Sequence, residues 1–173
     1  MNTSRKLLLA GAAAAVAATF ASSALAQASA STSATASITI FQPITVSKVT
    51  DLAFGRVIRP STGTTIYTID KDTGATGVSG GDGIFTSGGG TPGRATFTVN
   101  GEGGQVFTIG GDTSVTNGGV TINLVKSASA GTLDGTLGST GTATFGVGGN
   151  VTLTNASSTG TKSGSFNVTV TYQ

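Results

Sequence analysis

Short runs in which apolar and polar residues alternate make up most of the sequence after residue 26. The last run, residues 163–173, puts Phe166, Val168, Val170 and Tyr172 on one parity, with polar residues between them. A period of two is typical of a β-strand with one buried face. We therefore expect a strand here whose four large side chains face a core.

Similar runs recur along the chain, and no stretch after residue 26 keeps the 3.6-residue apolar period of a helix. The other candidate strands are residues 37–49, 52–58, 64–69, 83–87, 94–99, 105–110, 119–126, 131–137, 140–147 and 150–155. Between many of them lie Asn-Gly, Asp-Gly and Gly-Gly pairs, which tolerate the positive φ of hairpin turns. The pattern predicts an all-β fold, with an antiparallel Ig-like β-sandwich and Greek-key connections.

Glycines crowd residues 74–93, around the short apolar pair Ile84 and Phe85. Such a composition favours flexible connections over packed strands. We expect a long loop or an irregular hairpin here.

The first 26 residues follow the order of a secretory signal peptide, which is helical before cleavage. Arg5 and Lys6 precede an apolar run at residues 7–18, and Ala24-Leu25-Ala26 supplies a small-residue cleavage site. A membrane-spanning helix is the alternative, but the apolar run is short for one. We expect cleavage after Ala26 and export to the periplasm, the cell surface or the medium. No later segment is long and apolar enough to span a membrane as a helix.

Residues 27–36 form an N-terminal arm before a single β-sandwich domain at residues 37–173. Small or apolar residues fall on one parity of the arm and its continuation: Ala28, Ala30, Ala34, Ala36, Ile38 and Ile40. The arm is thus capable of forming a strand, although alanines bury little apolar surface. Two alternatives remain open: a disordered polar tail, or a start of the domain's own first strand at Ile38 and Ile40.

The chain contains no histidine and no cysteine. Ser-His-Asp and Cys-His nucleophilic sites, imidazole or thiolate zinc sites and disulfides are therefore excluded. Asp70-Lys71-Asp72-Thr73-Gly74 begins like a calcium loop but lacks the later ligands, which favours a solvated turn. A carboxylate pair, tested at Asp70 or Asp82, would be needed for hydrolase chemistry. We expect no enzyme, no catalytic residue, no metal and no cofactor.

The basic residues do not form a stripe. The nine lysines and arginines include Arg5 and Lys6, so the chain after residue 26 carries seven basic and seven acidic residues. A neutral domain without a basic patch is not expected to bind nucleic acid.

Four segments together carry a family resemblance: residues 45–55, 95–101, 144–151 and 160–172. They contain Leu-x-Phe-Gly, Phe-x-Val-Gly-Gly and a C-terminal Gly-x-Phe-x-Val-x-Val-x-Tyr. The chain resembles an uncharacterised family of exported bacterial β-domains, a domain of unknown function that is itself similar to chaperone-usher pilin-like and spore coat U domains. Gly160, thirteen residues before Gln173, and the penultimate Tyr172 also resemble the C-terminal signature of chaperone-usher pilins.

The resemblance implies a pilin-like sandwich and a fimbria-like structural or cell-surface subunit without catalytic residues. Assembly would proceed by β-strand addition, with partners that include other copies, pilus subunits, a periplasmic chaperone and an usher. Its interaction edges would be the alternating arm residues, Gly160 and the apolar face of residues 166–172. The alternative is a monomeric exported module that binds glycan or matrix through residues 74–93, with Tyr67 and Phe85 as platforms.

Overall fold

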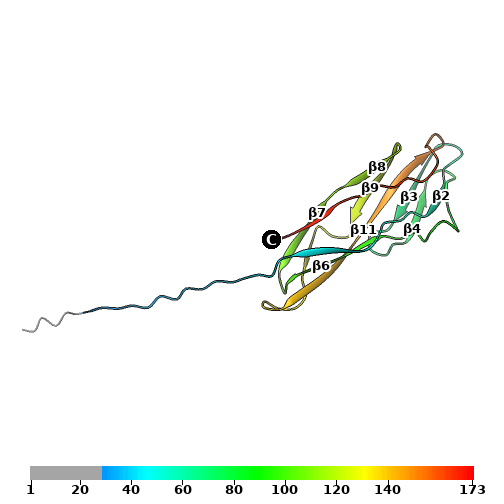
Figure 1. The fold of residues 1–173 in the computed structure, drawn as a ribbon. Helices are drawn as coiled ribbons and strands as arrows, with labels where there is room; N and C mark the ends of the chain where they lie inside the picture. Colours follow the sequence, from blue (N-terminus) through cyan, green and yellow to red (C-terminus); the bar gives the residue numbers. More distant parts are fainter. Residues whose placement is uncertain (1–28) are drawn as a thin grey trace, which may run out of the picture. The chain divides into compact units, whose positions relative to one another are not determined.

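The computed structural model describes residues 29–173 (Figure 1). Within this range the chain forms twelve strands and no helix, and all strand pairs are antiparallel. The expected all-β, antiparallel fold is confirmed. The expected signal peptide, residues 1–26, and Ala28 of the arm lie outside the described residues. Residues 39–173 form one compact unit.

The strands form two facing sheets and a small ribbon. The large sheet has the order β1 (Thr45–Thr50), β6 (Ala95–Glu102), β11 (Thr140–Thr154), β3 (Thr64–Ile69), β4 (Thr76–Ser79), and on β11 also β9 (Val120–Lys126), which pairs with β8 (Ser114–Asn117). The small sheet has the order β10 (Ala130–Thr132), β7 (Val106–Gly111), β12 (Val168–Tyr172). The ribbon is β2 (Arg56–Ile58) with β5 (Ile84–Thr86).

Strand β11 joins the large sheet together, because it pairs with β6, β3 and β9. The sequence predicted two strands here, at residues 140–147 and 150–155, and this was wrong. Gly148 and Gly149 do not form a turn. A Cβ at Gly148 would lie 2.3 Å from the Ile69 carbonyl oxygen, and one at Gly149 would lie 2.4 Å from that of Asn123. These glycines allow neighbouring backbones to approach closely inside a 15-residue strand.

The core has two parts. The first lies between the two sheets and contains the buried residues Ala95, Phe97, Val99, Phe107, Ile109, Leu124, Leu133, Phe145 and Val147. The second contains Tyr67, Val151 and Leu153 and is partly covered by Val57 and Phe85 of the ribbon. The Phe97 and Phe145 rings stack 5.2 Å apart in the first part. The ribbon therefore continues the core beyond the region that the small sheet covers.

Several predicted strands are shorter in the structure. Residues 37–44 form no strand, because the first strand pairs with β6 only from Thr45. The last strand is Val168–Tyr172 rather than 163–173, and the strand expected at 131–137 is Ala130–Thr132. Residues 74–93 contain β4 and β5 and are therefore only partly loop. Strands β4 and β8 were missed because each is short and its polar residues, together with Gly77 in β4, hide the alternation.

Candidate functional site

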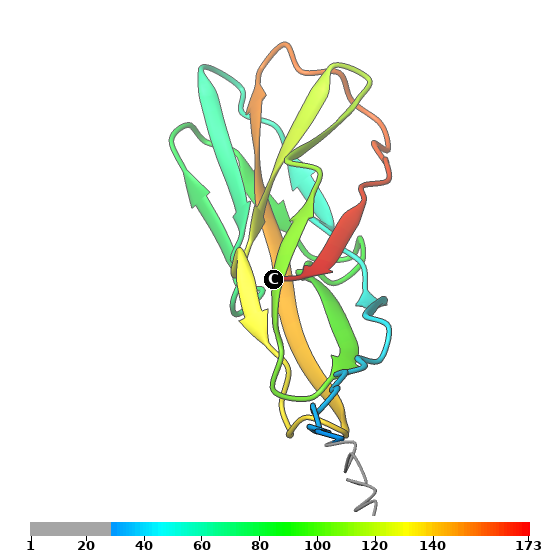
Figure 2. The ribbon, with the colours of Figure 1, turned by 90° about the vertical axis from the view of Figure 1, so that its left-hand side faces the viewer.

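The two sheets each end in a strand with a free edge on the same side of the domain. β12 ends the small sheet and pairs only with β7, while β1 ends the large sheet and pairs only with β6. Figure 2 shows β12, in red, and β1, in cyan, as neighbours. No strand lies between them in the described part of the chain. We call the space along these two edges the slit.

The slit exposes part of the core. Six half-buried side chains pack against the first core cluster from the two edges: Ile44, Val46, Leu52, Phe166, Val168 and Val170. The burial of β12 alternates as the sequence predicted, with Thr169 and Thr171 exposed on the other face. Phe166 also meets Phe97 edge to face, with ring centroids 6.2 Å apart. An added strand would cover this apolar surface and pair with the free edge of β12.

Tyr172 and Glu102 hold Gln42 at the end of the slit where β12 ends and β1 begins. The Tyr172 hydroxyl donates to the Gln42 carbonyl oxygen at 2.8 Å and accepts from the Glu102 backbone N–H at 2.6 Å. The Gln42 N–H donates to Glu102 Oε2 at 3.1 Å, and Thr140 Oγ1 donates to Gln42 Oε1 at 2.9 Å. The Phe41 ring meets that of Tyr172 edge to face. We call this group the Gln42 latch. It fixes the point at which the chain enters the domain.

The arm residues upstream of the latch are exposed and form no strand. Ile38 and Ile40 expose 83% and 77% of their surface, and Ala30, Ala34 and Ala36 are also exposed. Large aliphatic side chains so open to water are costly unless something covers them. The predicted alternation of apolar residues is therefore present in the arm, and no strand among residues 29–173 pairs with it.

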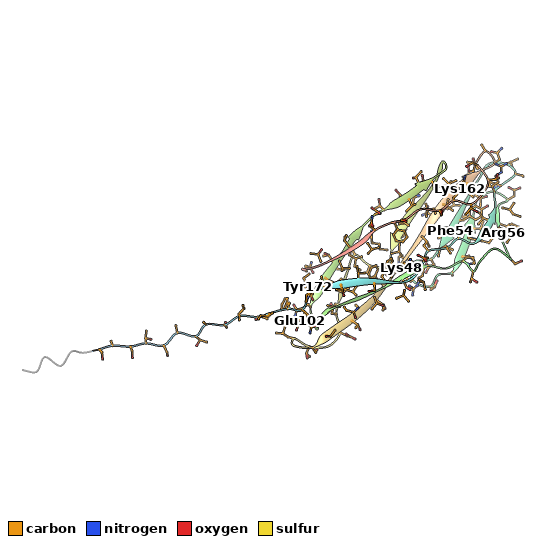
Figure 3. The ribbon with its side chains drawn as sticks, in the orientation of Figure 1. Lys48, Phe54, Arg56, Glu102, Lys162 and Tyr172 are labelled. Carbon is orange, nitrogen blue, oxygen red and sulfur yellow. The ribbon has the colours of Figure 1, made fainter. Side chains whose placement is uncertain are left out.

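A second concave feature lies at the opposite end of the domain from the latch (Figure 3). It is a cleft of about 560 Å³ between the β2 segment and residues 157–162. Its floor is apolar and comes from Phe54, Val57, Val120, Ile122, Val151 and Leu153. Its rim carries Arg56, Arg59 and Lys162, and Gly160 lies in the same wall. We call it the cationic cleft.

The charges of the domain are unevenly distributed around this cleft. Three of the seven basic residues after residue 26 line it, and none of the seven acidic residues does. Elsewhere, Lys48 and Lys71 form ion pairs with Asp51 and Asp72. Arg59 donates to the Ser157 carbonyl oxygen, which ties the two walls together. The residues that line the cationic cleft come from distant parts of the sequence, so no local sequence motif predicts the cleft.

The two aspartates considered for chemistry accept hydrogen bonds that hold turns and loops in place. Asp70 accepts hydrogen bonds from the Thr73 N–H, the Thr73 hydroxyl and the Asp72 N–H, and these bonds lower its pKa. Asp82 accepts from the Ser61 hydroxyl and N–H, which likewise lowers the pKa of Asp82. Within residues 29–173 no three acidic side chains gather as a metal site would require. Asp70 therefore organises its own turn, whereas Asp82 joins its loop to Ser61, 21 residues earlier in the chain.

Of the two aromatic platforms considered for a glycan module, Tyr67 is not available at the surface. Tyr67 is fully buried, and its hydroxyl donates to the Ile58 carbonyl oxygen. Burial raises the pKa of Tyr67. Phe85 is half-buried and packs edge to face on Tyr67, with ring centroids 5.4 Å apart. Tyr67 belongs to the second core cluster, so its prediction as a platform was wrong; Phe85 packs against that cluster and is half-buried.

Comparison with known families gives one match. Residues 44–172 match the family model described as Domain of unknown function (DUF4402). Searches of curated proteins and of solved structures found no match. Among the described residues, no helix has the length and hydropathy to cross a membrane.

Proposed function

The chain belongs to the DUF4402 family, and from this premise we propose that it is an exported, non-catalytic structural subunit of the cell surface that assembles by β-strand addition. The slit of one copy would accept the arm of the next. The observation that carries the proposal is the free edge of β12 beside half-buried apolar residues, in a chain whose own arm presents alternating apolar residues.

The acceptor has the two properties that strand addition requires. The outer edge of β12 offers backbone N–H and C=O groups that no described strand pairs with, and main-chain hydrogen bonds supply much of the affinity in this mode. The half-buried side chains of the slit would be covered by every second side chain of a bound strand. A bound strand whose inward-facing side chains were polar would leave this apolar surface in contact with water.

The donor has matching chemistry in its last few residues. Ile38 and Ile40 lie on one parity, and full burial of each is worth about 1.5–3 kcal/mol. The alanines upstream add less surface, so most of the apolar gain comes from these two positions. Association must also repay several kcal/mol of lost freedom. Assembly should therefore depend strongly on the two isoleucines.

The first test is the oligomeric state of the chain lacking residues 1–26, measured by size-exclusion chromatography with light scattering. We expect ladders of assembled copies from residues 27–173 and folded monomers when residues 27–40, which include Ile38 and Ile40, are removed. Loss of folding on truncation would show instead that the arm is a core strand. A stable monomer in both cases would contradict the proposal and favour a self-complete monomeric binding module.

A parity test separates strand addition from nonspecific association. The double substitution Ile38→Asp and Ile40→Asp should abolish the ladders, because both side chains would enter the slit. The matched control, Ser37→Asp with Thr39→Asp, adds the same charge on the other parity and should keep them. All four residues are exposed in the single chain, so neither variant should unfold the domain. Equal loss in both variants would refute the assigned parity.

A further inference from the structure

The cationic cleft has a floor and a rim of different chemistry. Its floor is made of aliphatic side chains and Phe54, whereas Arg56, Arg59 and Lys162 stand at its rim. We propose that this cleft binds an anionic amphiphile, a molecule with a carboxylate or phosphate head group and an aliphatic chain. The inference is independent of assembly through the slit.

Charge identifies the head group. A cleft lined by one sign of charge concentrates counter-ions, because the low-dielectric walls focus its field. No carboxylate lines the cleft to neutralise its three cations, and neither described ion pair involves them. The side chains of Arg56 and Lys162 form no hydrogen bond with another described residue, and the Arg59 side chain donates one hydrogen bond to the Ser157 carbonyl oxygen. Guanidinium groups bind carboxylate and phosphate through paired donors.

The floor identifies the rest of the ligand. Val57, Val120 and Ile122 are half-buried there, whereas Val151 and Leu153 are nearly covered. These side chains have no flat ring on which a sugar could stack, and Phe54 is the one aromatic residue of the lining. A volume of about 560 Å³ lies within the range of small-molecule sites. An aliphatic chain would cover this floor while its head group remained at the rim.

The arm of another copy would not satisfy this rim. Residues 27–47 contain no charged side chain, so an arm bound near the cleft would leave all three cations without an anion. The slit and the cationic cleft therefore have different ligand chemistry. The hydroxyl groups of Ser157, Ser158 and Thr159 in the wall can add hydrogen bonds to the same head group.

The probe is dodecyl phosphate below its critical micelle concentration, with binding to the chain lacking residues 1–26 measured by isothermal titration calorimetry. We expect saturable binding, with dodecanoate also bound and the neutral dodecyl maltoside bound at least about tenfold more weakly. Arg56→Gln and Lys162→Gln should each weaken binding by about tenfold. The matched control Lys48→Gln removes an exposed cation outside the cleft and should leave binding unchanged.

Further measurements identify the source of the ligand and test the competing ligand chemistry. Co-sedimentation with phosphatidylglycerol vesicles but not phosphatidylcholine vesicles, lost in Arg56→Gln, would support the proposal with a membrane lipid as the source. Binding of the monomeric probe without vesicle binding would support it with a free acid or phosphate. Equal affinity for dodecyl maltoside, equal weakening by Lys48→Gln, or binding of oligogalacturonate without dodecyl phosphate would overturn it.

Discussion

Removal of one oxygen atom from Tyr172 tests how the entry of the chain is held. In Tyr172→Phe the ring remains against Phe41, but two hydrogen bonds disappear together. These join the Tyr172 hydroxyl to the Glu102 N–H at 2.6 Å and to the Gln42 carbonyl oxygen at 2.8 Å. Glu102 is 1% exposed, so water cannot easily replace the lost acceptor.

The expected cost follows from the unequal burial of the two groups. A buried polar group left without a partner costs about 1–3 kcal/mol. Most of this cost comes from the unpaired Glu102 N–H. The Gln42 carbonyl is half-buried and can form a hydrogen bond with water instead. We expect the free energy of unfolding to fall by about 2 kcal/mol. With a urea m-value near 2 kcal/mol/M, the midpoint should fall by about 1 M.

The assay is urea unfolding followed by circular dichroism, on the chain lacking residues 1–40 so that assembly through Ile38 and Ile40 does not contribute. Thr171→Val on the exposed face of the same strand is the matched control, and its midpoint should stay within about 0.25 M of the parent. Hydrogen exchange at the Gln42 and Glu102 amides should accelerate in Tyr172→Phe. If the urea midpoint of Tyr172→Phe fell by less than that of Thr171→Val, and the amide exchange rates did not change, the stabilising role of the Gln42 latch would be refuted.

Two further predictions concern the ribbon end of the domain. Gly83→Ala should lower the melting temperature by several degrees, since its Cβ would lie 1.9 Å from Tyr67 Oη. The control is Gly93→Ala, because a Cβ at Gly93 would meet nothing within 4 Å. Equal melting temperatures of the two variants would contradict the close packing at Gly83. Hydrogen bonds from Ser61 lower the pKa of Asp82 in the folded state, so its contribution to stability should be complete above the ordinary aspartate pKa of about 3.9 and be lost as the pH falls through the lower folded value. Asp82→Asn should flatten this part of the stability–pH curve, and an unchanged slope would argue against the assignment.

The sequence predicted the strands whose alternation is local and one-sided. Residues 64–69 were placed as the structure has them, and β12 has its predicted buried face. Where the prediction was wrong, the cause was a tertiary contact. Gly148 and Gly149 look like a turn by composition, but the approach of neighbouring strands requires them inside β11. The strand expected from residue 37 begins at Thr45, because residues 37–44 pair with no strand in the described part of the chain.

The candidate sites could be predicted only in part. The apolar face of β12 and the parity of the arm were visible because each lies within one continuous segment. The role of Tyr172 could not be predicted, because its hydrogen-bond partner Gln42 is 130 residues away in the sequence. The cationic cleft depends on Arg56 and Lys162 meeting through the fold, and Gly160 was predicted as part of a C-terminal signature rather than as a wall of that cleft.

The position of β11, which is the eleventh of the twelve strands of the described domain, affects the order of folding. Because it pairs with β6, β3 and β9, both core clusters stay incomplete until residues 140–154 have been synthesised. Before then the chain can form local hairpins, such as β3 with β4 and β8 with β9, but isolated hairpins are only marginally stable in water. Contacts this distant in sequence also slow folding. We therefore expect the domain to fold cooperatively only once residues 140–154 are available for pairing.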